Sequence, residues 1–179
     1  MMNRKIFTVV LFLFAGFAAN AQNLSSEDQR IVEDAQRAKA DFIAEGNDMQ
    51  QMFDNSYAYV IFPNVGKGAY IVGGAAGNGA VYENGNLIGM AKLRQLDVGL
   101  QLGGKAFSEV IFFEDKQALE EFKQEELQLS GNASAVVIEE GKSGAIAFKD
   151  GIAIATMPKA GAMVSVSVGG QKFSFEPLN

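Results

Sequence analysis

The side chains available for chemistry in this chain are carboxylates, lysines, tyrosines and serines, because its 179 residues include no histidine and no cysteine. A Ser-His-Asp triad, an imidazole base, a thiol nucleophile, a zinc–thiolate site and a disulfide are all excluded. A glycosidase-like carboxylate pair is the remaining enzymatic alternative, but no two acids are marked as partners among Asp97, Glu120, Glu121, Glu125, Glu126, Glu139 and Glu140. We therefore expect a protein that is not an enzyme and has no catalytic residues, metal or cofactor.

A glycine-rich stretch at residues 73–79, Gly-Gly-Ala-Ala-Gly-Asn-Gly, has the composition of a phosphate-binding loop. Such loops work by leading into a helix whose N–H groups point at the phosphate. Here Ala80-Val81-Tyr82 follows, which is typical of a strand, and no Gly-Lys-Ser/Thr is present. The pattern favours glycines at a bulge or tight bend within a sheet.

The first 21 residues have the pattern of a signal peptide. Arg4 and Lys5 precede the apolar run 6–14, and Ala19-Asn20-Ala21 matches a cleavage site. We expect residues 22–179 to form the mature protein, a single domain of 158 residues with net charge −8, located in the periplasm or secreted. A retained N-terminal anchor is the alternative, and a bacterial lipoprotein is excluded by the absence of cysteine.

The acidic balance also argues against nucleic acid as a partner, because phosphate backbones require a basic stripe and the chain has no run of Lys and Arg. Any binding of anions must come from a local patch of basic residues.

The mature chain divides into a helical start and a glycine-rich remainder. Capping by Ser25 or Ser26 and a stop at Gly46 predict a helix, with a shorter helical piece around Met49 and Phe53. Strands are predicted over 57–62, ended by Pro63, and over 69–72, 80–82, 96–102, 110–113, 133–138, 145–148, 152–156, 163–168 and 173–175.

Turn signals lie between several of these strands, including Asn84-Gly85 and Asp150-Gly151. Asp115 is placed to cap a second helix that carries Ala118, Leu119 and Phe122. These elements predict an α+β fold: one curled antiparallel sheet or open barrel, covered by an N-terminal helix and a mid-chain helix.

Several segments in this order resemble the SYLF domain. They are the stretches 59–63, 67–70, 73–81, 98–103, 110–113, 129–134 and 166–170, which together cover nearly the whole mature chain. The resemblance implies a non-enzymatic, lipid-binding domain, and bacterial relatives are exported envelope proteins. Some eukaryotic relatives associate with actin, a partner that is not expected in a bacterial envelope.

This chain departs from the family pattern at residues 89–92 and at Lys159-Ala160-Gly161, and its first helix is acidic. The resemblance and the local turns point to Lys67 and Gly68, with Lys159, as contacts of an anionic lipid head group; Lys92 and Arg94 come next. The alternative function is a structural or protein-interaction module of the envelope without a lipid ligand.

Overall fold

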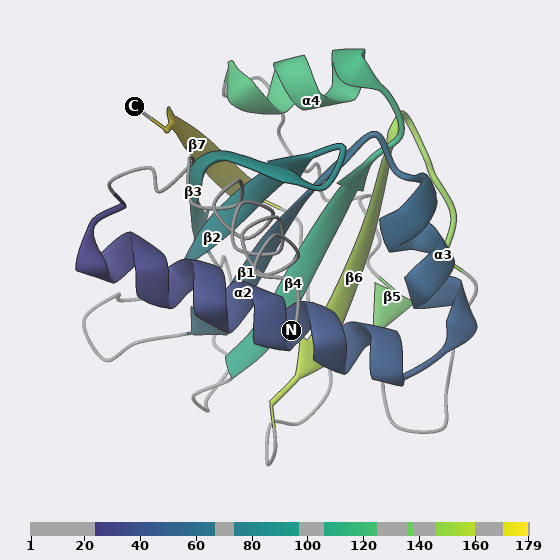
Figure 1. Ribbon diagram of the computed structural model, residues 1–179, viewed down its shortest axis with the longest axis horizontal. Helices are drawn as coiled ribbons and strands as arrows, with labels where there is room; N and C mark the ends of the chain where they lie inside the picture. Colours follow the sequence, from purple (N-terminus) through teal and green to yellow (C-terminus); the bar gives the residue numbers. More distant parts are fainter. Residues whose placement is uncertain are drawn as a thin grey trace, which may run out of the picture.

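The computed structural model describes residues 24–66, 74–96, 106–124, 136–137, 146–159 and 170–178. In chain order, the elements are α2 (Ser26–Ala44), α3 (Asn47–Asn55), β1 (Ala58–Gly66), β2 (Gly74–Glu83), β3 (Asn86–Leu96), β4 (Ala106–Phe113), α4 (Lys116–Lys123), β5 (Val136–Val137), β6 (Ile152–Pro158) and β7 (Gln171–Pro177). Figure 1 shows α2 crossing one face of the sheet, with α4 at the opposite end of the molecule.

The predicted helices are confirmed, together with their caps. The Ser25 hydroxyl accepts a hydrogen bond from the Asp28 backbone N–H at 3.1 Å, and α2 ends two residues before Gly46. Asp115 caps α4 in the same way, accepting from the Ala118 N–H at 2.9 Å. Each helix buries one stripe of apolar residues, which are Ala35, Ala38 and Phe42 in α2, Met49 and Phe53 in α3, and Ala118, Leu119 and Phe122 in α4.

The strands form one sheet in the order β5-β6-β4-β1-β2-β3-β7. Six strands pair antiparallel, as predicted, whereas the short β5 lies parallel to β6. The Asn84-Gly85 hairpin joins β2 to β3 with positive φ at both residues, the conformation that a tight two-residue turn requires. The α+β prediction of an open, curled sheet with helices at its start and middle is thus confirmed.

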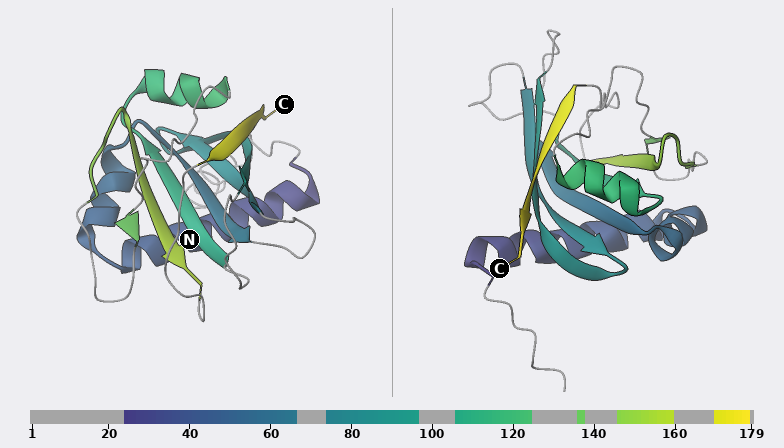
Figure 2. Two further views of the ribbon diagram at one scale, coloured as in Figure 1. Left: turned by 180° about the vertical axis from the view of Figure 1, so that it is seen from behind. Right: turned by 90° about the horizontal axis from the view of Figure 1, so that it is seen from above.

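The sheet curls so strongly that strands distant in its order face one another. The Gln171 side-chain amide of β7 donates to the Glu109 carboxylate of β4 at 2.9 Å, although β1, β2 and β3 lie between these strands. The rings of Phe62 and Phe173, on β1 and β7, are 5.9 Å apart. We call the face that carries these contacts the inner face, and α4 packs on it (Figure 2, right). Helices α2 and α3 pack on the opposite, outer face.

Residues 74–79 of the glycine-rich stretch lie within strand β2, so the prediction of glycines within a sheet is confirmed for them. A Cβ atom at Gly79 would lie 2.6 Å from the Ile61 carbonyl oxygen and 2.6 Å from the Phe62 ring. The glycine therefore allows β1 and β2 to approach closely at the curl.

Two strand predictions are wrong. Pro63 does not end β1, which continues to Gly66, because the pairing with β2 and with β4 shifts register there and Pro63, which has no N–H to donate, lies in the interval without ladder partners. The Pro63 carbonyl instead accepts from the buried Ser108 hydroxyl at 2.9 Å. Residues 146–148 form no strand; they precede a turn at Asp150-Gly151, where both residues have positive φ. The predicted strands at 69–72 and 163–168 and the signal peptide lie outside the described residues. Of the predicted strand 96–102, the structure describes only Leu96, which is the last residue of β3.

Candidate functional site

Three basic side chains gather on the outer face at β3 and β7. Lys92 and Arg94 are two residues apart on β3, and Lys172 lies directly opposite Arg94 on β7. All three are exposed, and they alternate with Leu93 and Phe173, which are buried on the inner face. We call Lys92, Arg94 and Lys172 the basic strip.

The basic strip contains a repulsive pair. Like charges directly opposite each other on antiparallel strands destabilise a sheet, yet neither Arg94 nor Lys172 has an acidic partner among the described residues. Lys92 differs from them because it forms an exposed ion pair with Glu176. On the β2 side, Arg94 and Lys92 are flanked by the small side chains of Ala76 and Asn78, which leave the cations open to a ligand.

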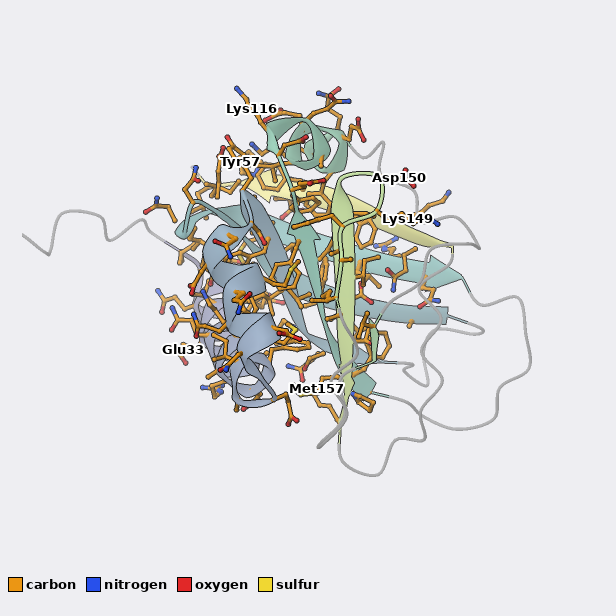
Figure 3. The ribbon with its side chains drawn as sticks, turned by 90° about the vertical axis from the view of Figure 1, so that its right-hand side faces the viewer. Glu33, Tyr57, Lys116, Lys149, Asp150 and Met157 are labelled. Atoms are coloured by element: carbon orange, nitrogen blue, oxygen red, sulfur yellow. The ribbon has the colours of Figure 1, made fainter. Side chains whose placement is uncertain are left out.

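The structure separates Lys159 from the basic strip. Lys159 follows β6, and β4, β1 and β2 lie between β6 and β3 in the sheet. It lines an open cleft of about 350 Å³ at the C-terminal end of α2, near Met157 (Figure 3), together with Asp41, Ala44, Glu45, Ser108, Met157 and Pro158. Two carboxylates and a helix C-terminus make this cleft a poor site for an anion.

Of the other predicted contacts, Lys92 and Arg94 lie together in the strip, while Lys67 and Gly68 lie outside the described residues. Sequence reasoning missed Lys172. The alternation Gln171-Lys172-Phe173-Ser174-Phe175 was a signal that could have placed Lys172 on the polar side of a half-buried strand.

Sequence reasoning also missed a polar cluster on the inner face. Glu109 is fully buried; Thr156 lies directly opposite it on β6, and Gln171 is hydrogen-bonded to it. Burial raises the pKa of the Glu109 carboxyl to about 7, against a smaller lowering by the hydrogen bond from Gln171. A sequence feature that could have indicated this buried acid is the run 107–113, in which Glu109 is the only charged residue and Ser108 the only other polar one.

The described residues offer little for catalysis. Within the described ranges, no three acidic, histidine or cysteine side chains are grouped to hold a metal ion. Glu120 and Glu121, considered above as acids, bond to Lys123 at 3.1 Å and Gln117 at 3.0 Å on α4 itself. Glu33 on α2 points away from the sheet (Figure 3). The arrangement is suited to binding charged groups at the surface.

None of the helices described by the structure has the length and apolar character needed to cross a membrane. Residues 94–177 match the family described as "Ysc84: Las17-binding protein actin regulator", which is the SYLF domain family. No curated protein matches the chain. The matched segment includes Arg94, Glu109, Lys159 and Lys172, and SYLF domains are binding domains rather than enzymes. The resemblance to the SYLF family seen in the sequence motifs is thus confirmed by the match over residues 94–177.

Proposed function

We propose that this protein is a non-enzymatic, exported binding module of the bacterial cell envelope. Its basic strip binds the anionic head groups of lipids or other amphiphiles. The observation that carries the proposal is the exposed Arg94–Lys172 pair, in which two like charges face each other without an acidic partner among the described residues. An anion bound between them would remove the repulsion that the pair otherwise contributes.

The chemistry of the strip fits a phosphate ester. The Arg94 guanidinium offers a planar set of N–H donors that can hold two phosphate oxygens, and Lys172 adds a point charge beside it. Lys92 is the third cation, and Glu176 moderates its charge. Because the whole chain is acidic, with a net charge of −6, this local patch must act against the overall field of the protein.

Charge reversal tests the basic strip directly. We expect Arg94→Glu with Lys172→Glu to lower the affinity for vesicles of phosphatidylglycerol and phosphatidylcholine at least about tenfold at low salt. Each basic residue near an anionic surface contributes about 1 kcal/mol, and each reversal also adds repulsion. Co-sedimentation of the mature protein with the vesicles measures the loss.

The matched control is Lys116→Glu with Lys149→Glu, which changes the net charge by the same amount at exposed positions on α4 and in the turn before β6. The control should bind like the wild type. Equal loss in both double variants would show that net charge alone governs binding and would overturn the assignment to the strip.

Export rests on the pattern of the first 21 residues and is tested separately. N-terminal sequencing of protein recovered from the envelope fraction should begin at Gln22. A first residue within Met1–Phe14 would contradict cleavage.

A protein partner is the second candidate function. The family description names binding to a protein, and α2 exposes acidic side chains such as Glu33 on the side away from the sheet. This reading predicts co-purification of a defined envelope protein and no binding to phosphatidylglycerol vesicles. Vesicle binding that depends on Arg94 and Lys172 favours the first candidate.

A further inference from the structure

Strand β7 carries both a buried hydrogen bond on the inner face and one cation of the basic strip on the outer face. Gln171 points inward and donates to Glu109 at 2.9 Å, while the next residue, Lys172, points outward and lies opposite Arg94. The Gln171–Glu109 bond therefore holds the edge strand that supplies one of the three cations. Besides this bond, β7 is held by its pairing with β3 and by Phe173, which packs against Phe62 and Phe122.

The polar cluster around this bond contains three oxygen atoms that make no hydrogen bond. Glu109 Oε1, Thr156 Oγ1 and Gln171 Oε1 are all buried without a hydrogen-bond partner. Ionisation of Glu109 would bury a negative charge whose Oε1 accepts no hydrogen bond, which is costly in a buried site. A proton on Glu109 removes this charge.

No charged group among the described residues faces Glu109 to stabilise its ionised form. The inward residues of the elements packed around it are all neutral: Phe62 on β1, Leu93 and Gln95 on β3, Phe107 and Ile111 on β4, Thr156 on β6, Gln171 and Phe173 on β7, and Ala118, Leu119 and Phe122 on α4. The nearby charges of α4, Glu120 and Lys123, are partly exposed and pair with each other.

We propose that protonated Glu109 is a latch: the neutral carboxyl stays buried under β7, whereas the ionised carboxylate, although it accepts a stronger bond from Gln171, favours a loosened β7 that lets water reach the charge. Anion binding at Arg94 and Lys172 then weakens as the pH rises through neutrality. This regulation rests on the proposed function of the basic strip. The chain has no histidine and no cysteine, so apart from the α-amino group it has no residue whose ordinary pKa lies near neutrality.

Hydrogen exchange of the β7 amides tests the latch without any ligand. Burial raises the pKa of Glu109 to about 7, and an opened strand would return the group towards its ordinary value. We therefore expect the opening equilibrium of β7 to rise about tenfold between about pH 6 and about pH 8, after correction for intrinsic exchange rates. The central strand β1 serves as the internal reference.

Glu109→Gln separates the latch from general effects of pH. The glutamine amide copies the neutral acid in shape and supplies a permanent donor, so β7 protection in this variant should not change with pH. Glu114→Gln, at an exposed position after β4, is the matched control and should keep the wild-type profile. Should Glu109→Gln fail to fold, hydrogen exchange in the wild type still tests the latch. Equal changes in the protection of β7 and β1 between about pH 6 and about pH 8 would overturn it.

Vesicle binding tests the link to the strip. Phosphatidylglycerol keeps its charge between about pH 6 and pH 8, so we expect wild-type binding to weaken over this range in proportion to the fraction of molecules with β7 open, as hydrogen exchange measures it, and Glu109→Gln binding to stay constant. Equal binding at both pH values, with β7 unchanged, would overturn the latch and leave the proposed function standing. A pH-dependent β7 without vesicle binding at either pH would support the latch and overturn the proposed lipid ligand.

Discussion

At β3 and β7, the two faces of the sheet differ in whether their polar side chains are buried or exposed. On the inner face, Gln171 of β7 is buried and donates to Glu109 of β4, among apolar residues such as Leu93 of β3 and Phe173 of β7. On the outer face of the same strands, Arg94 and Lys172 are exposed and lie opposite each other without an acidic partner among the described residues. Alternation along a single strand thus places a neutral buried network and a cationic surface one residue apart.

The contrast indicates that, at β3 and β7, inward side chains contribute mainly to stability and the outward cations contribute mainly to binding. Buried contacts contribute free energy of folding because they remove apolar area from water and satisfy polar groups. Exposed cations contribute little to stability but act on charged ligands over several ångströms. Neighbouring substitutions on one strand should therefore have separable effects.

The largest difference in the free energy of unfolding is expected between substitutions of Phe173 and Lys172. Phe173→Ala should reduce the free energy of unfolding by about 3–5 kcal/mol, because it removes a buried ring that packs against Phe62 and Phe122. Lys172→Ala should change it by no more than about 0.5 kcal/mol. Urea unfolding followed by circular dichroism measures both values. Similar losses in the two variants would break the division between the faces.

The next effect is the pH dependence of stability that Glu109 contributes. Its pKa is raised to about 7 in the folded protein, so its stabilising effect is complete below about pH 4.5 and is lost as the pH rises through 7. We expect the free energy of unfolding of the wild type, relative to Glu109→Gln, to fall by about 2–3 kcal/mol between about pH 5 and about pH 8. Parallel pH profiles of the two proteins would show that Glu109 titrates near its ordinary value.

The smallest expected effect concerns Glu176 and tests whether Lys92 belongs to the binding surface. Glu176→Gln breaks the exposed ion pair with Lys92, and surface pairs of this kind contribute less than about 0.5 kcal/mol to stability. The same change frees Lys92 and removes a negative charge, so affinity for phosphatidylglycerol vesicles should rise about two- to fivefold. Glu114→Gln provides the control for removing one acid away from the strip. Unchanged affinity in Glu176→Gln would limit the binding surface to Arg94 and Lys172.

The parts of the fold that depend on local chemistry could be predicted from the sequence. Caps at Ser25 and Asp115 and the Asn84-Gly85 turn act within a few residues, so their signals survive in any context. The prediction that Pro63 ends a strand failed because it treated proline as a local stop. The register shifts on both sides of β1 are a property of the assembled sheet.

The candidate site could be predicted only in part, for a related reason. Lys92 and Arg94 share a strand, so their proximity is local. Lys172 joins them only through the β3–β7 pairing, and Lys159 is kept apart from them by the strand order. The burial of Glu109 depends on the curl of the whole sheet, which no pattern of periodicity within β4 reveals.

The strand order also has a consequence for how the protein acquires its structure. β7 is the last described strand and pairs with β3, which lies far earlier in the chain. During synthesis the β2–β3 hairpin is available early. The backbone groups on the edge of β3 that faces away from β2 stay unpaired until residues 171–177 have been made. Contacts of such long sequence separation form slowly, and an unpaired edge is a template for pairing with other chains. A nascent or truncated chain that stops before Gln171 would therefore present β3 to its neighbours, and aggregation would compete with folding until the C-terminal strand arrives.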